Sequence, residues 1–307
     1  MTRVAAVDCG TNTIKLLIAD LDAETGTEHE LVREMRMVRL GQDVDRTGRF
    51  ADEAMERAFA AIDEYAAVVR PYDVEAIRFC ATSAARDASN GAEFAAGVEA
   101  RLGVRPEVVT GAEEAQLSFD GATRGLAGAG LPDPVLVVDI GGGSTELILG
   151  DGHGHVRAAQ SLDIGSVRMT ERHLRHDPPT HEEVAEASRA VASAIAGSDV
   201  PLERARTVIG VAGTITTVAA GVLDLAEYDR TAIDQARLAV GDVHALTERL
   251  LAMTVAERRA LGYMHPGRAD VIGAGALILD EVLRRTPVDT LLVSEADILD
   301  GIAWSIA

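Results

Sequence analysis

Two segments of the chain share one pattern of apolar and polar positions. In each segment a short apolar run ends in an aspartate, a Gly/Thr-rich corner follows, and a second apolar run is closed by a turn. The first copy spans residues 4–26 and the second spans residues 135–152, with Asp8 and Asp139 in matching places. Short apolar runs bounded by turn residues indicate β-strands. Each copy therefore predicts strand, tight loop, strand and turn, and the repetition indicates an internal duplication with one copy per domain.

The segments between these copies carry apolar residues at helical spacing. This spacing predicts helices over residues 51–69, 92–102, 113–127, 181–197 and 242–261. Pro71 stops the first of them, because proline cannot continue a helix. A Gly-rich stretch at 125–130, followed by two prolines, predicts a boundary between a domain of residues 1–125 and a domain of residues 126–307. The pattern as a whole predicts an α/β chain.

The composition excludes several classes of protein. With 47% hydrophobic and 25% charged residues, the chain has the balance of a globular protein. It contains no run of about 18 apolar residues, and Asp8 interrupts the start too early for a signal peptide, so we expect no membrane span. Cys9 and Cys80 cannot form a disulfide framework, which favours a cytoplasmic location. The net charge of −20 opposes binding of nucleic acid or an anionic membrane.

The Gly/Thr corners are candidate phosphate sites. A strand that turns through Gly, Ser and Thr presents backbone N–H groups and hydroxyls in one concavity, and glycine lets the backbone approach the anion closely. Asp8 and Asp139 add hard oxygens for Mg²⁺ or Mn²⁺. One such loop alone is typical of an ordinary hairpin, but two in register favour phosphate. The candidate contacts are Gly10, Thr11, Asn12, Thr13, Gly141, Gly142, Gly143, Ser144 and Thr145, with Gly213 and Thr214 in a third Gly/Thr segment.

The single lysine of the chain lies beside the first corner. Among 29 basic residues only Lys15 is a lysine, and it follows Asn12 by three positions. Codon bias explains why lysines are rare but not where this one lies. Its position indicates either an ammonium close to phosphate or a chance placement, and both readings remain open.

Glu113 and Glu114 open a predicted helix. Acidic residues in a first helical turn commonly favour the helix dipole. Neighbours on a helix point about 100° apart, so one carboxylate can face a cleft while the other faces solvent. Hydrolysis of a phosphoanhydride needs a carboxylate that positions and deprotonates water. One member of the pair is therefore a candidate general base.

Arginines supply the other candidate contacts. Arg86 is predicted either to form a surface ion pair with Asp87 or Glu93, or to bind a phosphate oxygen with its guanidinium fork. Residues 33–49 hold five arginines against three acidic residues. This local positive excess either guides a polyanion or forms a solvated strand face.

Two further groups favour plain structural roles. His153 and His155 suggest a metal pair, but no third ligand lies near them in the sequence, so an exposed turn is favoured. Cys9 has no nearby histidine to activate it, which favours a small residue at a crowded turn.

The corners and their duplication resemble the actin-like ATPase superfamily, which includes sugar kinases, heat-shock-70-type chaperones and acetate kinases. The finer resemblance is to the exopolyphosphatase / guanosine pentaphosphate phosphohydrolase (Ppx/GppA) family. Many members end their last motif in Arg-Glu-Gly, whereas this chain has Leu299-Asp300-Gly301, so any phosphate contact of that arginine is in doubt here. The segments that carry the resemblance are residues 6–13, 81–86, 110–115, 138–146 and 210–214.

This resemblance implies a fold of two ribonuclease H-like (actin-like) domains with a central cleft. It also implies Glu114 as the general base, with Asp139 and Glu146 as further catalytic residues. The implied metal ligands for Mg²⁺ are Asp8, Asp139 and Glu146, and the implied substrate-binding residues include Lys15 and Arg86 beside the loops.

The leading functional interpretation is a Mg²⁺-dependent exopolyphosphatase that releases orthophosphate from the end of inorganic polyphosphate. The same apparatus could hydrolyse guanosine pentaphosphate, the nucleotide of the stringent response, and composition does not separate the two. A sugar or carboxylate kinase would need an adenosine pocket, which only the loop at 210–217 favours. A non-catalytic phosphate or nucleotide sensor would keep the loops without a base, and Glu114 argues against it. The resemblance leaves a homodimer open.

Overall fold

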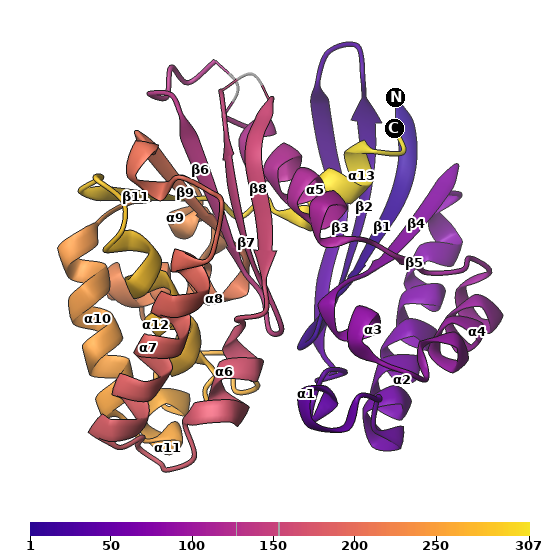
Figure 1. Ribbon diagram of the computed structural model, residues 1–307. Helices are drawn as coiled ribbons and strands as arrows, with labels where there is room; N and C mark the ends of the chain where they lie inside the picture. The colour runs from indigo at the N-terminus through magenta and orange to yellow at the C-terminus, as the bar shows by residue number, and fades with distance from the viewer. Residues whose placement is uncertain (127, 153) are drawn as a thin grey trace. The chain divides into compact units, whose positions relative to one another are not determined.

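Two mixed β-sheets, each with its own helices, organise the chain (Figure 1). The computed structural model describes residues 1–126, 128–152 and 154–307. Unit 1 consists of Met1–Gly121 together with Ile298–Ala307, and unit 2 consists of Ala122–Asp297. The division thus differs from the one predicted at residues 125 and 126, above all because the last ten residues return to unit 1.

The return of the C-terminus has a simple physical reason. Helix α13 (Ile298–Trp304) carries Leu299 and Ile302, which are fully buried. They share a hydrophobic cluster with Val4 and Leu17 of the unit 1 sheet. Burial of these side chains is favourable only against a matching apolar surface, and the unit 1 sheet provides it.

The sheet of unit 1 has the strand order β3-β2-β1-β4-β5. Strands β1, β2 and β3 form an antiparallel meander, whereas β4 and β5 continue parallel to β1. The strands are β1 (Thr2–Cys9), β2 (Thr13–Asp22), β3 (Thr27–Met37), β4 (Ala76–Ala81) and β5 (Glu107–Val108). The helices are α1 (Val44–Thr47), α2 (Asp52–Val69), α3 (Ser83–Asp87), α4 (Gly91–Leu102) and α5 (Gly111–Arg124), with the 3₁₀ turn η1 (Arg70–Tyr72).

Strand β1 lies in the middle of this sheet and is apolar along most of its length. Successive side chains of a strand point to opposite faces. Accordingly Ala5 and Val7 belong to the cluster beneath α2 and α4, whereas Val4 and Ala6 belong to the cluster beneath α13. The helix predicted over 51–69 is confirmed as α2, which ends in the 3₁₀ turn that contains Pro71.

The sheet of unit 2 has the strand order β10-β11-β9-β6-β7-β8. Its strands are β6 (Val135–Ile140), β7 (Thr145–Gly150), β8 (Val156–Leu162), β9 (Thr207–Val211), β10 (Arg237–Ala239) and β11 (Thr290–Val293). Its helices are α6 (Ser166–His173), α7 (His181–Ala196), α8 (Ala212–Val222), α9 (Arg230–Ile233), α10 (Val240–Ala252), α11 (Val255–Arg259) and α12 (Ile272–Leu283), with the 3₁₀ turn η2 (Leu202–Arg204).

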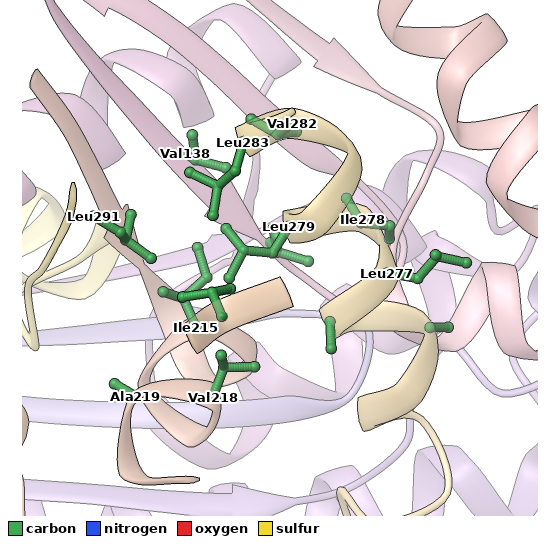
Figure 2. Close-up of a cluster of buried hydrophobic side chains, with 14 of the residues drawn as sticks. Val138, Ile215, Val218, Ala219, Leu277, Ile278, Leu279, Val282, Leu283 and Leu291 are labelled. Atoms are coloured by element: carbon green, nitrogen blue, oxygen red, sulfur yellow. The ribbon is translucent and has the colours of Figure 1, made fainter. Parts of the chain in front are cut away.

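Helix α12 was not predicted from the sequence. Every one of its residues is buried, so it lacks the alternation of apolar and polar positions that reveals a surface helix. Figure 2 shows its side chains Leu277 and Leu279 in the cluster that also holds Ile215 and Val218 of α8. The single helix predicted over 242–261 is also corrected, because the chain breaks between α10 and α11.

The two sheets repeat the same plan, as the sequence predicted. The order β3-β2-β1-β4-β5 of unit 1 is matched by β8-β7-β6-β9-β11 of unit 2. In each unit an antiparallel meander comes first, and the next strand joins it parallel to the meander's first strand.

Within the described residues, no helix combines the length and apolar character that crossing a membrane requires.

Candidate functional site

The first Gly/Thr corner joins β1 to β2 in a tight turn, closed by a hydrogen bond from Gly10 N to Thr13 O of 2.9 Å. Just before and after it, Asp8 and Lys15 are direct cross-strand partners. Directly opposed residues of antiparallel strands place their side chains on one face. The Lys15 ammonium accordingly lies 3.7 Å from Asp8 Oδ2, and both side chains are largely buried. The only lysine of the chain therefore places a cation beside the strand-end carboxylate of unit 1.

The segment directly after β3, residues 38–41, is hydrogen-bonded to this corner. Asn12 O accepts hydrogen bonds from Val38 N and Arg39 N, both at 3.0 Å, and Thr11 O accepts one from Gly41 N at 2.8 Å. A Cβ atom at Gly41 would lie 2.2 Å from Thr11 Cγ2, so only glycine allows this approach. The carbonyl groups of the corner are thereby fixed to the body of unit 1.

The candidate base, Glu114, is buried and paired. Arg86 Nη1 donates a hydrogen bond of 2.7 Å to Glu114 Oε2 and another of 3.0 Å to Val109 O. Burial raises the pKa of the Glu114 carboxyl above its ordinary value, against the opposing effects of Arg86 and of a hydrogen bond from Thr82. Arg86 thus reaches this buried carboxylate, a pairing that the sequence did not predict.

Glu113 has a different environment, as the helical geometry predicts. Its carboxylate is exposed and accepts a hydrogen bond of 2.7 Å from Arg78 Nη2. Glu114 is only 7% exposed. A group in contact with bulk water has an ordinary basicity, whereas a buried carboxylate is a stronger base. Of the two neighbours, Glu114 is the one suited to accept a proton.

The first Gly/Thr corner and the Arg86–Glu114 pair lie at the same edge of the unit 1 sheet. Strands β1 and β4 are parallel neighbours, so their carboxyl ends meet at one edge. Thr82 follows β4 and donates from its backbone N–H to Cys9 O at 3.1 Å. Helix α3, which carries Arg86, starts directly after Thr82.

The second corner joins β6 to β7 with the same turn. Gly141 N donates to Ser144 O at 3.0 Å, as Gly10 donates to Thr13 in unit 1. The cross-strand partners here are Asp139 and Glu146, which are 5% and 1% exposed. Unit 2 therefore has a glutamate where unit 1 has Lys15.

These two carboxylates are the best candidate metal ligands. Glu146 Oε1 accepts a hydrogen bond of 2.7 Å from Ser161 Oγ, which orients it. Mg²⁺ is commonly bound through one or two protein carboxylates, while water and substrate phosphate complete its shell. Asp139 and Glu146 fit this mode. No cluster of three or more His, Cys, Asp or Glu side chains suited to a metal ion occurs among the described residues.

The third Gly/Thr segment forms the start of α8. Ala212 has φ of 67°, a left-handed conformation that is uncommon for a residue with a side chain. A Cβ at Gly213 would lie 2.2 Å from Arg268 Nη2, so the guanidinium packs directly against this glycine. Arg268 Nη1 also donates to Thr217 Oγ1 at 3.0 Å, and burial lowers the pKa of Arg268. The predicted contact Thr214 follows and is buried.

Sequence reasoning missed Arg268, as well as Arg168, whose Nε donates to Gly143 O at 2.8 Å. The residues around Arg268 include glycine and proline and show no helical or strand period. Nothing local therefore marks this arginine as a neighbour of Gly213. Arg168 is the third residue of α6, a short helix between β8 and α7 that the sequence did not predict.

Each unit thus brings one set of the predicted residues to one edge of its sheet. In unit 1 these are Asp8, Gly10, Thr11, Asn12, Thr13, Lys15, Arg86 and Glu114. In unit 2 they are Asp139, Gly141, Gly142, Gly143, Ser144, Thr145, Glu146, Gly213 and Thr214.

The last motif, Leu299-Asp300-Gly301, contacts the arginine-rich stretch of residues 33–49 within unit 1. Asp300 is buried and pairs with Arg33, whose Nη1 lies 3.3 Å from Asp300 Oδ2. Arg33 also pairs with Glu30, and Arg36 pairs with Glu64. These contacts favour the strand-face interpretation of the stretch over a guide for a polyanion.

The described contacts of His155 and Cys9 fit the structural roles that the sequence favoured for them, an exposed turn and a small residue at a crowded turn. His155 is exposed and lies 3.3 Å from Asp151 Oδ1, whereas His153 lies outside the described residues. Burial raises the pKa of the Cys9 thiol well above its ordinary value, which disfavours a reactive thiolate.

Comparison of the chain with known proteins identifies its family. The model of the Ppx/GppA phosphatase family matches residues 17–307. Exopolyphosphatase 2 of Mycobacterium tuberculosis H37Rv is 50% identical over 320 aligned positions, which cover 100% of this chain and 99% of the relative. A bifunctional 3-dehydroquinate synthase/phosphatase of Fusobacterium nucleatum is 30% identical, and the match covers 97% of this chain and 45% of the relative.

Solved structures share the fold over the full length. A crystal structure of an exopolyphosphatase-like protein has a TM-score of 0.96 at 48% identity and covers 100% of this chain and 98% of its own. The Aquifex aeolicus Ppx/GppA family member has a TM-score of 0.82 at 31% identity, with 99% and 97% covered. An exopolyphosphatase from Cytophaga hutchinsonii has a TM-score of 0.90 at 28% identity, with the same coverage. The predicted α/β fold is confirmed, the protein is a hydrolase, and the chain belongs to the Ppx/GppA phosphatase family.

Proposed function

We propose that this protein is an exopolyphosphatase, which hydrolyses the terminal phosphoanhydride of inorganic polyphosphate and releases orthophosphate. The observation that carries the proposal is the pairing of buried Glu114 with Arg86 at the sheet edge that also holds the first phosphate corner. A base and a guanidinium at such an edge are the groups that water attack on a phosphoryl group requires. The relative from Mycobacterium tuberculosis that is 50% identical to this chain is named exopolyphosphatase 2, which supports the same substrate.

In this mechanism Glu114 accepts the proton of the attacking water. Its burial raises the pKa of the carboxyl, so the carboxylate is a stronger base than an exposed one. Arg86 holds Oε2 through its 2.7 Å hydrogen bond and thereby fixes the orientation of the carboxylate that accepts the proton. The guanidinium can also donate to a phosphoryl oxygen, because its planar fork presents several donors.

The Gly/Thr loop of each unit offers backbone N–H groups to phosphate oxygens. Lys15 adds a positive charge at the first loop, where it also balances Asp8. A bound Mg²⁺ would supply positive charge against the phosphate chain and the leaving oxygen. Asp139 and Glu146 would hold this ion, since they are buried cross-strand partners with the hard oxygens that it prefers.

The proposal is tested by orthophosphate release from three substrates in parallel: tripolyphosphate, long-chain polyphosphate and guanosine pentaphosphate, each with Mg²⁺. We expect the wild-type protein to release orthophosphate from polyphosphate, and Glu114→Gln to lose this activity. Glu113→Gln is the matched control, because it makes the same chemical change one residue away on an exposed side chain. Release from guanosine pentaphosphate without release from either polyphosphate would overturn the proposal.

A further inference from the structure

The second phosphate loop is tied to the start of α6 through the carbonyl oxygens of three successive glycines. The bonds run from Ser166 N to Gly141 O at 2.9 Å, from Val167 N and Arg168 N to Gly142 O at 2.9 and 3.1 Å, and from Arg168 Nε to Gly143 O at 2.8 Å. The first two glycines are thus held by main-chain donors. The third is held by the side chain of Arg168.

The loop and the residue before α6 are also in direct backbone contact. A Cβ at Gly165 would lie 2.4 Å from the carbonyl carbon and oxygen of Gly142 and 2.5 Å from Gly143 N. These atoms belong to the backbone and cannot rotate away as a flexible side chain could. The loop is therefore packed against this segment as well as bonded to it.

The direction of the carbonyl groups decides the direction of the N–H groups. In a trans peptide unit the C=O of one residue and the N–H of the next point to opposite sides. The carbonyls of residues 141–143 point at α6, so the N–H groups of residues 142–144 point away from it. Such a row of N–H groups is the arrangement that binds phosphate oxygens.

A run of three glycines needs this restraint. Glycine loses more conformational freedom on ordering than any other residue, so a free Gly-Gly-Gly loop would rarely hold its N–H groups in one direction. The corner of unit 1 has only one glycine, Gly10, and its carbonyls at Thr11 and Asn12 accept bonds from main-chain donors. In unit 2 the more flexible loop receives an additional hydrogen bond from a side-chain donor, Nε of Arg168.

We infer that Arg168 is a positioning residue of the phosphate site: its Nε fixes the third glycine carbonyl and thereby aims the N–H groups of the second loop at substrate. This inference rests on the proposed function, because it names how that site holds its substrate. Arg168 then acts through the loop and not through its charge. The consequence is specific, since a neutral side chain that donates from the same place should replace it.

Glutamine is such a side chain. Its amide nitrogen is separated from Cα by the same number of atoms as Nε of arginine, so Arg168→Gln keeps the donor and removes the charge. Arg168→Met keeps the length and removes both. The matched control is Arg157→Met in the same unit, because Arg157 is exposed and pairs only loosely with Asp151 at 3.5 Å.

Steady-state kinetics with tripolyphosphate and hydrogen–deuterium exchange of the peptide over residues 139–148 form the test. We expect Arg168→Met to raise KM about 10-fold with a smaller effect on kcat, as the loss of one hydrogen bond predicts. Its loop amides should exchange faster. Arg168→Gln should restore both KM and the exchange rate towards wild type, and Arg157→Met should change neither.

Two results would overturn the inference. One is a KM and an exchange rate for Arg168→Met that equal those of the wild type. The other is a rise in KM for Arg168→Gln as large as for Arg168→Met with unchanged exchange, which would show a direct contact between charge and substrate. If Arg168→Met does not fold, Arg168→Gln alone decides between donor and charge. If the wild type releases no orthophosphate from polyphosphate, the proposed function fails, while the exchange data still test the positioning.

Discussion

Arg86 donates a hydrogen bond of 2.7 Å to Glu114, and this bond joins a cation to a carboxylate that is only 7% exposed. Arg86 and the burial of the side chain have opposite effects on the pKa of Glu114. Burial raises the pKa of Glu114, whereas Arg86 lowers it. Arg86 therefore orients the carboxylate and favours its ionised form, whereas burial makes the carboxylate more basic.

The first prediction separates catalysis from binding. Glu114→Gln keeps the size of the side chain but cannot accept a proton, so turnover should fall by roughly 10²–10⁴-fold, the usual contribution of general-base catalysis. Binding of tripolyphosphate, measured by calorimetry, should survive or strengthen because one negative charge has gone. Glu113→Gln should remain active, since that side chain is exposed and pairs with Arg78. A dead Glu113→Gln beside an active Glu114→Gln would assign the base to the other residue.

The second prediction concerns pH. The base must be deprotonated, so kcat/KM should fall as the pH drops through the pKa of Glu114, which burial raises above the ordinary 4.5. Arg86 lowers that pKa, and its replacement in Arg86→Met should shift the acid limb to still higher pH. The position of the limb is the measurement, because the absolute rate should fall in this variant for other reasons too. A limb that moves to lower pH would contradict the pairing.

The third prediction assigns the metal ligands. Glu146→Gln and Asp139→Asn should each weaken Mg²⁺ binding by about 10-fold or more, the effect typical for loss of a group that holds or orients a metal. Asp8→Asn should leave Mg²⁺ affinity near that of the wild type, because Asp8 is paired with Lys15. Calorimetric titration with Mg²⁺ compares the three variants. Equal losses in all three would restore Asp8 to the ligand set that the sequence implied.

The fourth prediction uses the close backbone contact at Gly165. Gly165→Ala would place a methyl group 2.4 Å from the Gly142 backbone, so the second loop must shift and KM for polyphosphate should rise. Gly241→Ala is the control, because a Cβ there meets nothing within 4 Å and alanine favours the helix. Kinetics that are alike in the two variants would show that the loop tolerates the displacement.

The sequence allowed good prediction where the information is local. The strand-corner-strand copies follow from short apolar runs and glycines, and the different environments of Glu113 and Glu114 follow from the angle between helical neighbours. The break between α10 and α11 was also visible, because Thr254 and Glu257 form a capping box that begins a new helix. The prediction of one helix over 242–261 passed over that signal.

The rest depends on contacts between distant parts of the chain. The pairing of Arg33 with Asp300 and the return of α13 to unit 1 join segments that are far apart in sequence, and no local pattern encodes such partners. Helix α12 lacks a polar face, so periodicity cannot identify it. The bond from Arg168 to Gly143 could be predicted only once the path of the chain after β8 is known.

The last prediction concerns the stability of unit 2. Arg258 is only 3% exposed, yet its guanidinium donates to the main-chain carbonyls of Met253, through Nε and Nη2, and of Ala269, through Nη1. These bonds connect Met253, which lies just before α11, with Ala269, near the end of the segment that links α11 to α12. Arg258→Met would leave the carbonyls without these donors, and each unsatisfied buried group costs about 1–3 kcal/mol.

Unit 2 should therefore unfold at a temperature several degrees lower in this variant, as followed by calorimetry. Arg259→Met is the matched control, because Arg259 is the next residue and is exposed. Its removal should shift unfolding little, since surface substitutions usually change stability by less than about 0.5 kcal/mol. An equal shift in the two variants would mean that the loss reflects net charge, and the buried bonds of Arg258 would then add nothing measurable to stability.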